Sequence, residues 1–447
     1  MAILGTGREG QAARRFLRSR YPGIELTLVA EKAPESDFMD QLTQQDRLLT
    51  GPLADAGLDD FDILVRSPGI SPYRKSIQGA LAAGVKVTTP SNMWFAENPG
   101  QKTVCITGTK GKSTTSALLA HMLNACGYRA QLAGNIGLPL LDCEVEGIDW
   151  WVIELSSYQL ADLEAEPSVA VILNLSSEHL DWHGDERTYR EDKLRLATLA
   201  NNRPLIANAA DPVLSTALSG RDQISWFNSE SGVRARGTQL LDGAVDLQVG
   251  APKGLPGTHN LSNAAAALTV LKVIGANLEA GLQSLASFRS LPHRLEVLGD
   301  RAGVEYVNDS ISSTPLATVA ALDAFSGKNV TLIVGGLDRG LNWAPYMHQI
   351  RARTPHAVIG IPDNGSRIIG EMELADVNPG QGLHIKPDLA EAVKLAQKLT
   401  PAGGIVLLSP GAPSFPQFCD YRDRGREFAE NCGFVFRETE LFSAGKK

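Results

Sequence analysis

The stretch Thr-Val-Cys-Ile-Thr-Gly-Thr-Lys-Gly-Lys-Ser-Thr-Thr, residues 103–115, decides how this chain of 447 residues is organised. Residues 104–106 are apolar and predict a short buried strand, and the chain from Thr114 onward predicts a helix. A turn with two glycines joins them, so backbone N–H groups and the positive end of the helix dipole converge on one point. This arrangement is typical of a phosphate-binding site.

The turn also offers the side chains that a nucleotide needs. Lys112 can reach the β- and γ-phosphates, and a hydroxyl group from Ser113 or Thr114 can bind Mg²⁺. The spacing departs from the common nucleotide-binding loop, which has a glycine where this chain has Ile106. A tight strand-to-helix turn without a ligand is the alternative interpretation.

The composition narrows the class of protein. The length indicates about two to four domains, and 43% hydrophobic and 21% charged residues are ordinary for a globular protein. A net charge of −8 without a basic block argues against a general nucleic-acid binder. The sequence has no signal peptide and no run of about 18 apolar residues, so we expect no membrane span. The cysteine spacing fits neither a metal site nor a disulfide framework, which predicts reduced thiols in the cytoplasm.

A second glycine motif lies near the N-terminus. After a short strand at residues 2–4, Gly-Thr-Gly-Arg-Glu-Gly at residues 5–10 leads into a helix predicted for residues 11–17. Such glycines let the backbone approach a diphosphate. A strand at residues 25–29 is followed by Glu31, at the distance where a dinucleotide-binding fold holds a ribose. Taken alone, these features predict NAD binding.

Another loop follows the strand predicted for residues 61–65. It reads Arg-Ser-Pro-Gly-Ile at residues 66–70, and open α/β sheets bind ligands at the carboxyl ends of their strands. An ordinary Pro-Gly β-turn is the alternative. Residues 90–101 are rich in Pro, Asn and Gly and predict a linker to the central strand.

Three polar side chains of the central region are candidate site residues. Glu154 follows a wholly apolar strand at residues 150–153, where a carboxylate usually holds Mg²⁺; a solvated Glu is the alternative. His179 follows the next strand at the same sheet edge, which favours a functional histidine over a structural one. Lys193 lies on a helix predicted for residues 186–197, where a lysine is normally a solvated surface charge.

Residues 204–250 predict short strands and turns without a chemical signal. Asn260 and Asn263 then open the helix predicted for residues 264–274, and their spacing puts both side chains on one face. Capping of that helix by Asn260 is the alternative to a binding role.

From residue 291 the sequence alternates between strands and helices and predicts a separate doubly wound unit. We expect strands at 304–307, 330–334, 356–361 and 405–408, and helices at 316–325, 343–352, 389–399 and 421–431. The loops at 308–310, 335–340 and 409–415 follow strands and therefore share one edge. Asp309 or Asp338 could bind a ribose or pair with Arg339; an ordinary Asp cap is the competing interpretation.

Taken together, the motifs of the chain resemble those of the Mur ligase family. The resemblance covers nearly the whole chain, and so many motifs in the same order make chance agreement remote. It rests on GTKGKST at 108–114, GNIGLP at 134–139, ELSSYQL at 154–160, EHLD at 178–181, YREDK at 189–193, HNLSN at 259–263, LPHR at 291–294, NDS at 308–310, GGLDRG at 335–340 and SPGAPSFPQF at 409–418.

The resemblance implies an α/β fold of three domains. These are a Rossmann-like UDP-substrate-binding domain at 1–95, a central P-loop-type ATPase with a mostly parallel sheet at 96–290, and a Rossmann-like glutamate-binding domain at 291–447. It implies an ATP-dependent ligase that joins glutamate to UDP-N-acetylmuramoyl-L-alanine through an acyl phosphate, in peptidoglycan precursor synthesis. The glycines at 5–10 would then bind a UDP-sugar instead of NAD. We expect a cytoplasmic monomer that uses ATP and two Mg²⁺ ions and binds neither nucleic acid nor a membrane.

The resemblance also assigns residues by their matching positions. For ATP it implies Gly108, Thr109, Lys110, Gly111, Lys112, Ser113, Thr114, Asn260, Asn263, Arg294 and Asp309. For the UDP-substrate it implies Gly5, Thr6, Gly7, Ser67, Gly69, Asn135, Ser156, Gln159 and His179. For glutamate it implies Ser313, Arg339, Ser414, Phe415 and Tyr421. The implied metal ligands are Ser113, Glu154, His179 and Lys193, and the catalytic set is Lys112, Glu154, His179 and Lys193. Lys193 matches a lysine that is carbamylated in the family, which turns a cation into a carboxylate-like ligand.

The chain departs from the family pattern mainly at the residues that would recognise the amino-acid substrate. Ile311 stands in place of a lysine and Ser313 in place of a threonine, and residues 409–418 differ from the usual SPACASxDQF. Glu178, before the family histidine, replaces an aspartate. This pattern resembles the branch that adds L-glutamate and leaves inversion to a separate epimerase. We therefore predict an L-glutamate ligase, with the D-glutamate-adding enzyme as the alternative.

Two other classes of protein agree less well with the sequence. A folylpolyglutamate synthase-like ligase shares the ATP site, but the loops at 5–10 and 66–70 do not belong to that class of enzyme. A non-catalytic nucleotide-binding module would not need Glu154, His179 and Lys193 together.

Overall fold

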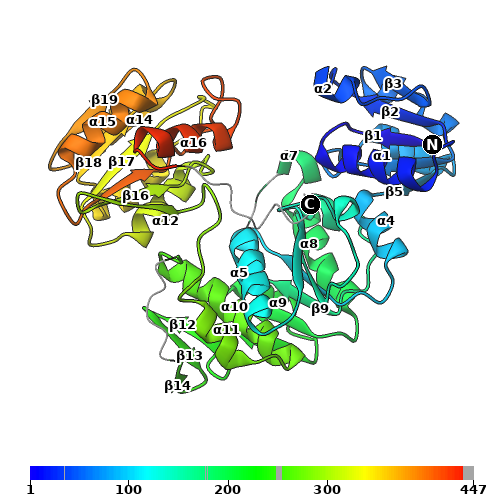
Figure 1. Cartoon of the computed structure of the whole chain (residues 1–447), viewed down its shortest axis with the longest axis horizontal. Coiled ribbons are helices and arrows are strands. Elements are labelled where there is room, and N and C mark those ends of the chain that lie inside the picture. The colour runs from blue at the N-terminus through cyan, green and yellow to red at the C-terminus, as the bar shows by residue number, and fades with distance from the viewer. Residues whose placement is uncertain (35, 177, 179, 248–253, 436–447) are drawn as a thin grey trace.

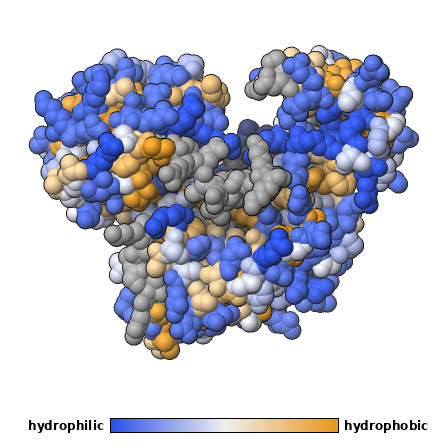
Figure 2. Space-filling model, in the orientation of Figure 1, coloured by the Kyte–Doolittle hydropathy of each residue, from blue (hydrophilic) through white to orange (hydrophobic). Residues whose placement is uncertain are grey.

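A computed structural model describes residues 1–34, 36–176, 178, 180–247 and 254–435 of the protein. The chain forms three lobes, and each is built on a largely parallel sheet (Figure 1). The N-terminal lobe (residues 1–89) and the C-terminal lobe (residues 291–435) both contact the central lobe (residues 90–289) and stand apart from each other. The space-filling view has a notch between these two outer lobes (Figure 2). The α/β fold class predicted from the sequence is confirmed.

The N-terminal lobe has a five-stranded parallel sheet in the order β3-β2-β1-β4-β5. The hydrophobic residues of β1 and all those of β4 except the half-buried Ile63 are buried, since helices cover the sheet. Its elements are β1 (Ala2–Leu4), α1 (Arg8–Arg20), β2 (Leu26–Ala30), α2 (Ser36–Met39), β3 (Asp46–Thr50), β4 (Ile63–Arg66), α3 (Lys75–Ala82) and β5 (Lys86–Thr88).

The central lobe has a six-stranded parallel sheet in the order β11-β10-β9-β6-β8-β7. A small antiparallel sheet, β12-β13-β14, packs beside it. The elements are α4 (Pro90–Glu97), β6 (Thr103–Thr107), α5 (Lys112–Ala125), β7 (Ala130–Gly134), β8 (Trp150–Glu154), α6 (Ser157–Leu160), β9 (Val169–Ile172), α7 (Leu180–His183), α8 (Glu186–Ala200), β10 (Leu205–Asn208), α9 (Pro212–Ala217), β11 (Ile224–Phe227), β12 (Val233–Arg236), β13 (Gln239–Asp242), β14 (Val245–Asp246), α10 (Thr258–Ile274) and α11 (Leu278–Ser284).

Strand β6 is the middle of this lobe and is covered on both faces. Side chains alternate across a strand, so Val104 and Ile106 pack in the core that contains α5 and α10, while Cys105 packs in the core that contains α8. A strand buried on both faces reads as a continuous apolar run, which is why residues 104–106 predict it. Trp94 of α4 also packs into the central core, against Trp151 at a ring distance of 4.8 Å.

The C-terminal lobe has a six-stranded sheet in the order β15-β16-β20-β17-β18-β19. Only the edge strand β15 is antiparallel to its neighbour. The elements are β15 (Glu296–Arg301), β16 (Val304–Asn308), α12 (Pro315–Ala324), β17 (Val330–Val334), α13 (Met347–Ala352), β18 (Ala357–Gly360), α14 (Gly365–Leu374), β19 (Leu383–Ile385), α15 (Leu389–Leu399), β20 (Ile405–Leu408) and α16 (Tyr421–Asn431).

Several predicted elements differ in extent or were not predicted at all. Helix α5 begins at Lys112 and not at Thr114, and α1 is longer at both ends than residues 11–17. The residues predicted as one helix at 343–352 form a 3₁₀ turn followed by α13. The linker predicted for residues 90–101 is wrong in its first part, which forms α4. The sequence analysis also left unpredicted the elements α2, α3, α6, α7, α9, α11, α14, β3, β5, β7, β15 and β19. The domain boundaries at 95/96 and 290/291 stay predictions. No helix in the described part of the chain is long and apolar enough to span a membrane.

Candidate active site

The predicted phosphate loop lies at the carboxyl end of β6, between the ends of β8 and β9. Gly108 and Gly111 have φ values of 156° and 84°, which favour glycine. At Gly111 a side chain would also collide with a neighbour, because a Cβ atom there would lie 2.4 Å from Oδ1 of Asn263. The loop therefore needs glycine at this position for both conformation and space.

Thr109 anchors the loop to the neighbouring strand connection. Its hydroxyl group lies 2.8 Å from the hydroxyl of Tyr189, donates to the carbonyl of Ser176 at 3.0 Å and accepts from the Ser176 N–H at 2.9 Å. The backbone N–H of Lys110 donates to Oδ1 of Asn174 at 2.7 Å, and Asn174 Nδ2 donates to the Lys110 carbonyl at 2.9 Å. These bonds hold the loop in one shape before any ligand binds.

Two lysines converge on the loop from different helices. Nζ of Lys112 donates to the carbonyls of Gly108 and Thr109 at 2.9 and 3.0 Å, and Nζ of Lys193 donates to the same Gly108 carbonyl at 2.8 Å. Lys193 is only 2% exposed, so the expectation of a surface lysine is wrong. Lys193 lies on the buried face of α8, which packs on the sheet. Tyr189 and Leu196, one turn before and one turn after it, are buried on the same face.

The electrostatics of the two lysines follow from this burial. Burial lowers the pKa of Lys112, and the charges of Glu154 and Glu178 partly oppose the shift. Burial and then the charge of Lys112 lower the pKa of Lys193 well below its ordinary value. A buried amine with a lowered pKa has a larger neutral, nucleophilic fraction than a surface lysine.

Glu154 is the last residue of β8 and is paired in register with Ile106 of β6. It is 1% exposed, so the alternative of a solvated carboxylate is wrong. Its Oε1 accepts from Nδ2 of Asn135 at 2.7 Å, and its Oε2 is buried without a hydrogen-bond partner. A buried carboxylate oxygen without a partner is costly, which indicates that a ligand completes the site.

This carboxylate oxygen is the best indication of a metal site. Among the described residues there is no group of three or more His, Cys, Asp or Glu side chains that could hold a metal ion. His179, one of the expected ligands, lies outside the described residues. Mg²⁺ is usually held by only one or two protein carboxylates, with phosphates and waters as the other ligands. Glu154 and the hydroxyl group of Ser113, on the first turn of α5, fit that requirement.

The two asparagines near the start of α10 lie on one face of the helix, as their spacing predicts, and Asn263 lies next to Gly111 of the loop. Nδ2 of Asn263 donates to Oδ1 of Asn260 at 3.1 Å, and Nδ2 of Asn260 donates to the carbonyl of Pro256 at 2.6 Å. The capping alternative is wrong, because the helix begins at Thr258 and Gly257 is its N-cap.

In the N-terminal lobe, the two predicted loops meet. The hydroxyl of Ser67 donates to the carbonyl of Gly5 at 3.4 Å, and Thr6 and Gly7 lie at the start of α1. Nε1 of Trp182, from the central lobe, donates to the carbonyl of Gly69 at 3.2 Å. Glu31, the expected ribose partner of the NAD interpretation, forms an exposed ion pair with Arg74 at 2.7 Å.

Ser156 and Gln159 satisfy each other's backbone groups. The Ser156 hydroxyl accepts from the Gln159 N–H at 3.3 Å, and Gln159 Oε1 accepts from the Ser156 N–H at 3.0 Å. This is a capping box at the start of α6. It places both residues directly after Glu154 with fixed side chains.

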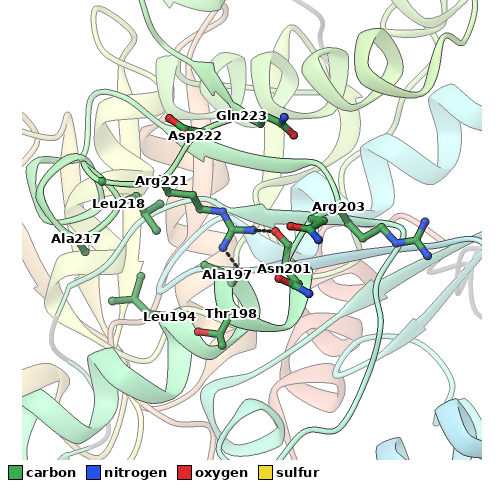
Figure 3. Close-up of a pocket in the computed structure, with 12 residues that line it drawn as sticks. Leu194, Ala197, Thr198, Asn201, Arg203, Ala217, Leu218, Arg221, Asp222 and Gln223 are labelled. Carbon is green, nitrogen blue, oxygen red and sulfur yellow. Dashed lines mark hydrogen bonds between the residues drawn. The ribbon is translucent and has the colours of Figure 1, made fainter.

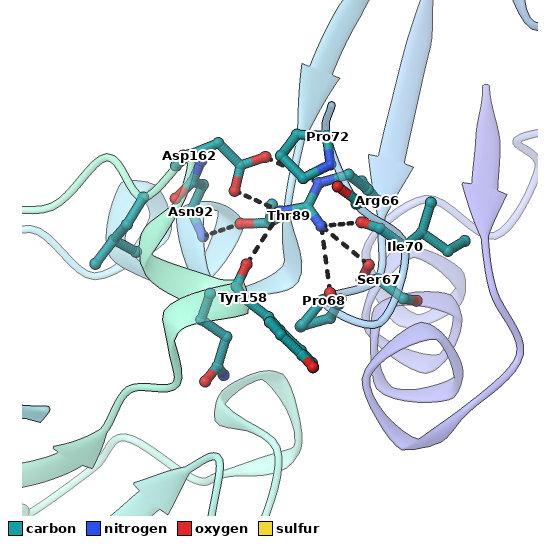
Figure 4. Close-up of polar contacts among 12 residues, drawn as sticks. Arg66, Ser67, Pro68, Ile70, Pro72, Thr89, Asn92, Tyr158 and Asp162 are labelled. Carbon is teal, nitrogen blue, oxygen red and sulfur yellow. Dashed lines mark hydrogen bonds and ion pairs between the residues drawn. The ribbon is translucent and has the colours of Figure 1, made fainter. Parts of the chain in front are cut away.

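The sequence did not point to the side chains that join the N-terminal and central lobes. The side chain of Arg66 has no exposed surface. It forms a bidentate ion pair with Asp162, with N–O distances of 2.6 and 2.9 Å (Figure 4). It also donates to the backbone carbonyls of residues 67, 68, 70 and 158. The hydroxyl of Tyr73 donates to Asp192 at 2.6 Å. Each partner is about 90 to 120 residues away in sequence, so no local pattern marks these pairs.

In the C-terminal lobe, Asp309 is buried at the end of β16. Its Oδ2 accepts from the hydroxyls of Ser312 and Ser409 at 2.5 and 2.8 Å, and its Oδ1 accepts from the N–H of Leu295 at 3.1 Å. Burial raises the pKa of Asp309 to about 6, although the hydrogen bonds and the charge of Arg294 oppose this. Arg294 also influences the pKa of Lys112, so its charge acts on both lobes.

The predicted glutamate residues lie around the same sheet edge but are not equally accessible. Ser414 is 4% exposed and Phe415 is 51% exposed. Ser313 and Tyr421 are half-buried, and Arg339 is exposed. The expectation that Asp338 pairs with Arg339 is wrong, because the partner of Asp338 is Arg367, at 2.8 Å.

One cavity of about 660 Å³ lies elsewhere, at the C-terminal end of α8 (Figure 3). Arg221 crosses it and donates to the carbonyls of Ala197 and Asn201, both at 2.5 Å. These bonds satisfy the last carbonyls of the helix. The cavity contains none of the residues predicted for the site.

Comparisons with known proteins cover the whole chain. Family models match residues 1–89 (Mur ligase MurD-like, N-terminal domain), 106–271 (Mur ligase middle domain) and 293–411 (Mur ligase, glutamate ligase domain). The UDP-N-acetylmuramoyl-L-alanine–L-glutamate ligase of Xanthomonas euvesicatoria pv. vesicatoria is 44% identical, over 97% of this chain and 95% of that protein. The protein of the same name from Micromonospora sp. is 39% identical, over 96% and 95%.

Solved structures with the same fold are more distant in sequence. MurF ligase from Thermotoga maritima in complex with ADP aligns with a TM-score of 0.61 at 16% identity, over all of this chain and 95% of that one. UDP-N-acetylmuramate-alanine ligase from the same organism aligns with a TM-score of 0.59 at 18% identity, over 97% and 98%. These likenesses support the three-lobed α/β fold.

Proposed function

The chain belongs to the Mur ligase family, and we propose that it joins L-glutamate to UDP-N-acetylmuramoyl-L-alanine with cleavage of ATP to ADP and phosphate, in peptidoglycan precursor synthesis. The observation that carries this proposal is the agreement, over nearly the full length of both chains, with relatives that bear this activity in their names. The site is consistent with it, because a glycine loop, the half-buried Lys112, the buried Lys193 and the buried Glu154 meet at one point.

In this proposal the phosphate loop binds the triphosphate of ATP. The N–H groups of residues 108–114 and the amine of Lys112 contact the phosphates, and Lys110 lies at the exposed rim of the loop. Asn260, Asn263, Arg294 and Asp309 surround the nucleoside. The amine of Lys112 would leave the Gly108 and Thr109 carbonyls for the phosphates, since a phosphate oxygen is the stronger acceptor.

The reaction has two bond-forming steps. A carboxylate oxygen of the L-alanyl group attacks the γ-phosphorus, and ADP leaves. The amine of glutamate then attacks the carbonyl carbon of the acyl phosphate, and phosphate leaves as the amide forms. Lys112 offsets the repulsion between the attacking carboxylate and the triphosphate, because both are anions in a site shielded from water.

Magnesium and a modified lysine complete the proposed site. Ser113, Glu154, His179 and Lys193 would hold two Mg²⁺ ions, which would supply further positive charge at the γ-phosphate. Lys193 fits this role only after its neutral amine has attacked CO₂ and lost a proton, which converts it to an anionic carbamate. The lowered pKa of Lys193 favours that modification, because the neutral amine is the reactive form.

The outer lobes would bring the other two substrates. We assign Gly5, Thr6, Gly7, Ser67, Gly69, Asn135, Ser156, Gln159 and His179 to the UDP-substrate, and Ser313, Arg339, Ser414, Phe415 and Tyr421 to glutamate. Asn135 links the two sites, since it already contacts Glu154. A monomer would suffice for this reaction, and a separate epimerase would then act on the product. A nucleotide-linked sugar and ATP as substrates place the reaction in the cytoplasm.

Phosphate release with UDP-N-acetylmuramoyl-L-alanine and each enantiomer of glutamate tests the proposal. We expect ATP-dependent phosphate release with L-glutamate, and a product mass that corresponds to one added glutamyl residue. Faster turnover with D-glutamate would contradict the choice of enantiomer. No glutamate-dependent release with either enantiomer would contradict the ligase function itself.

A further inference from the structure

Arg424, on the first turn of α16, is a buried arginine that the proposed mechanism does not use. It is 1% exposed, and its guanidinium group donates hydrogen bonds to three loops. Nη2 donates to the carbonyls of Ser310 and Ala412 at 2.7 and 3.0 Å, Nε donates to the Ser310 hydroxyl at 3.0 Å, and Nη1 donates to the Gly335 carbonyl at 3.4 Å. These loops follow β16, β20 and β17, which are neighbours in the sheet. One side chain therefore holds together the starts of three adjacent loops.

The same loops also bind each other directly around Arg424. The N–H groups of Gly335 and Leu337 donate to the carbonyls of Pro410 and Pro413, both at 2.9 Å. No side chain fits at Gly336, because a Cβ atom there would lie 2.1 Å from the Pro413 oxygen and 2.9 Å from Nη1 of Arg424. The guanidinium group thus lies close to the backbone at Gly336, where the loops after β17 and β20 meet.

The charge of Arg424 is not neutralised by an ion pair. No ion pair between described residues includes it, and its four acceptors are carbonyl and hydroxyl oxygens. Asp309 is close enough to affect its pKa, which burial lowers to about 9, but the Asp309 Oδ2 is bonded to two serine hydroxyls. Arg424 therefore stays protonated at neutral pH and leaves positive charge at this sheet edge. A buried cation without a paired anion is costly, unless a ligand or a structural requirement offsets the cost.

We propose that Arg424 is a positioning residue for the amino-acid substrate, which fixes the spacing of the three loops and gives their edge a positive charge that favours an acidic amino acid. Its burial prevents direct contact with the substrate, so it acts through the loops. This role rests on the proposed glutamate ligase function. A lysine cannot replace it, because one ammonium group lacks the planar fork that reaches three loops at once.

Arg424→Lys tests the role, with Ser310→Ala as a second variant and Arg426→Lys as the matched control. Ser310→Ala removes the hydroxyl contact to Nε and the hydrogen bond of 2.8 Å that this hydroxyl donates to the Tyr421 carbonyl. It leaves the guanidinium group in place, so we expect it to fold even if Arg424→Lys does not. Arg426 lies on the same helix but is exposed and paired with Asp423. For each protein we would measure the KM of L-glutamate, of ATP and of UDP-N-acetylmuramoyl-L-alanine, and the acyl phosphate trapped by hydroxylamine without glutamate.

We expect Arg424→Lys to raise the KM of L-glutamate about 10- to 100-fold, because a small displacement of binding groups has effects of this size. Ser310→Ala should raise it less, and Arg426→Lys should not change it. The other two KM values and the trapped acyl phosphate should stay within about twofold of wild type. An equal rise in all three KM values, or a lowered unfolding temperature without a change in the KM of L-glutamate, would overturn this role. A wild-type protein without glutamate-dependent turnover would overturn the proposed function as well.

Discussion

The two junctions of the central lobe are held in different ways. Towards the N-terminal lobe, two side-chain pairs cross the junction: the buried Arg66 with Asp162, and the exposed Tyr73 with the buried Asp192. Towards the C-terminal lobe, no hydrogen bond or ion pair between described residues joins residues 90–289 to residues 296–435.

This difference indicates which lobe is free to move. The lobe assigned to the UDP-substrate and the lobe assigned to ATP are fixed to each other, so their two substrates meet in a preset geometry. Between described residues no such bond holds the lobe assigned to glutamate to the central lobe, so it can close after the first two substrates have bound. Closure of this kind keeps water from a reactive acyl phosphate.

The largest effect is expected at the phosphate loop of the central lobe, which both outer lobes flank. Lys112→Ala should lower kcat about 10²- to 10³-fold, the size found when one preorganised charge donor is removed. The thermal unfolding midpoint should not fall, because the variant removes a buried amine whose charged form is disfavoured. Steady-state phosphate release and thermal unfolding check this. Lys272→Ala, which removes a surface pair with Asp242, is the control and should keep full activity.

The next largest effect is expected at the fixed junction. Asp162→Ala leaves the fully buried Arg66 with only backbone acceptors, and we expect a loss of about 2–3 kcal/mol in the free energy of unfolding. This is at the low end for a buried pair, because 28% of the Asp162 side chain is exposed. Urea unfolding measures it. A change below about 1 kcal/mol would mean that other contacts hold this junction.

A smaller, pH-dependent effect is expected from Glu9, which lies at the same junction. Burial raises the pKa of Glu9 from 4.5 to about 7; the charge of Arg8 opposes this and that of Asp142 adds to it. The folded protein therefore holds this proton more tightly than the unfolded chain, and stability falls as the pH rises from 4.5 through 7. Glu9→Gln should raise the free energy of unfolding by about 1–2 kcal/mol at pH 8. The same gain at pH 4, where Glu9 is protonated in both states, would contradict this explanation.

The smallest effect is expected from an exposed pair of the C-terminal lobe that matches the junction pair in chemistry. Asp338 pairs with Arg367 at 2.8 Å, and Arg367 also bonds to Glu371 and to the carbonyl of Leu341. Asp338→Asn should therefore leave the unfolding midpoint unchanged, because exposed pairs contribute little. A loss similar to that of Asp162→Ala would show that burial does not explain the difference between the two pairs.

The sequence predicts the parts of the molecule that depend on local patterns. The strand, glycine turn and helix around Lys112 are local, and so is the buried end of β8 at Glu154. The burial of Lys193 has a local signal too, since Tyr189, Leu196 and Ala200 continue the same helix face. Its neighbours in sequence are mostly polar, however, and that pattern suggested a solvent-exposed helix.

Other features have no local signal at all. Arg66 and Arg424 look like ordinary surface arginines, because Asp162 and Ser310, to which they donate, are 96 and 114 residues away in sequence. Arg339 lies next to Asp338 in sequence, yet the chain turns so that Arg367 is the partner. Strand β15 was missed because it is an edge strand whose positions are half-buried or exposed, so it lacks a continuous apolar run.

The central claim, ligation of L-glutamate through an acyl phosphate, is tested most directly by isotope transfer. UDP-N-acetylmuramoyl-L-alanine labelled with ¹⁸O in both carboxylate oxygens would be incubated with ATP and L-glutamate, and the released phosphate analysed by mass spectrometry. If the carboxylate attacks the γ-phosphorus, each released phosphate carries one ¹⁸O atom. Phosphate without the label, or label transfer that requires D-glutamate, would contradict the claim.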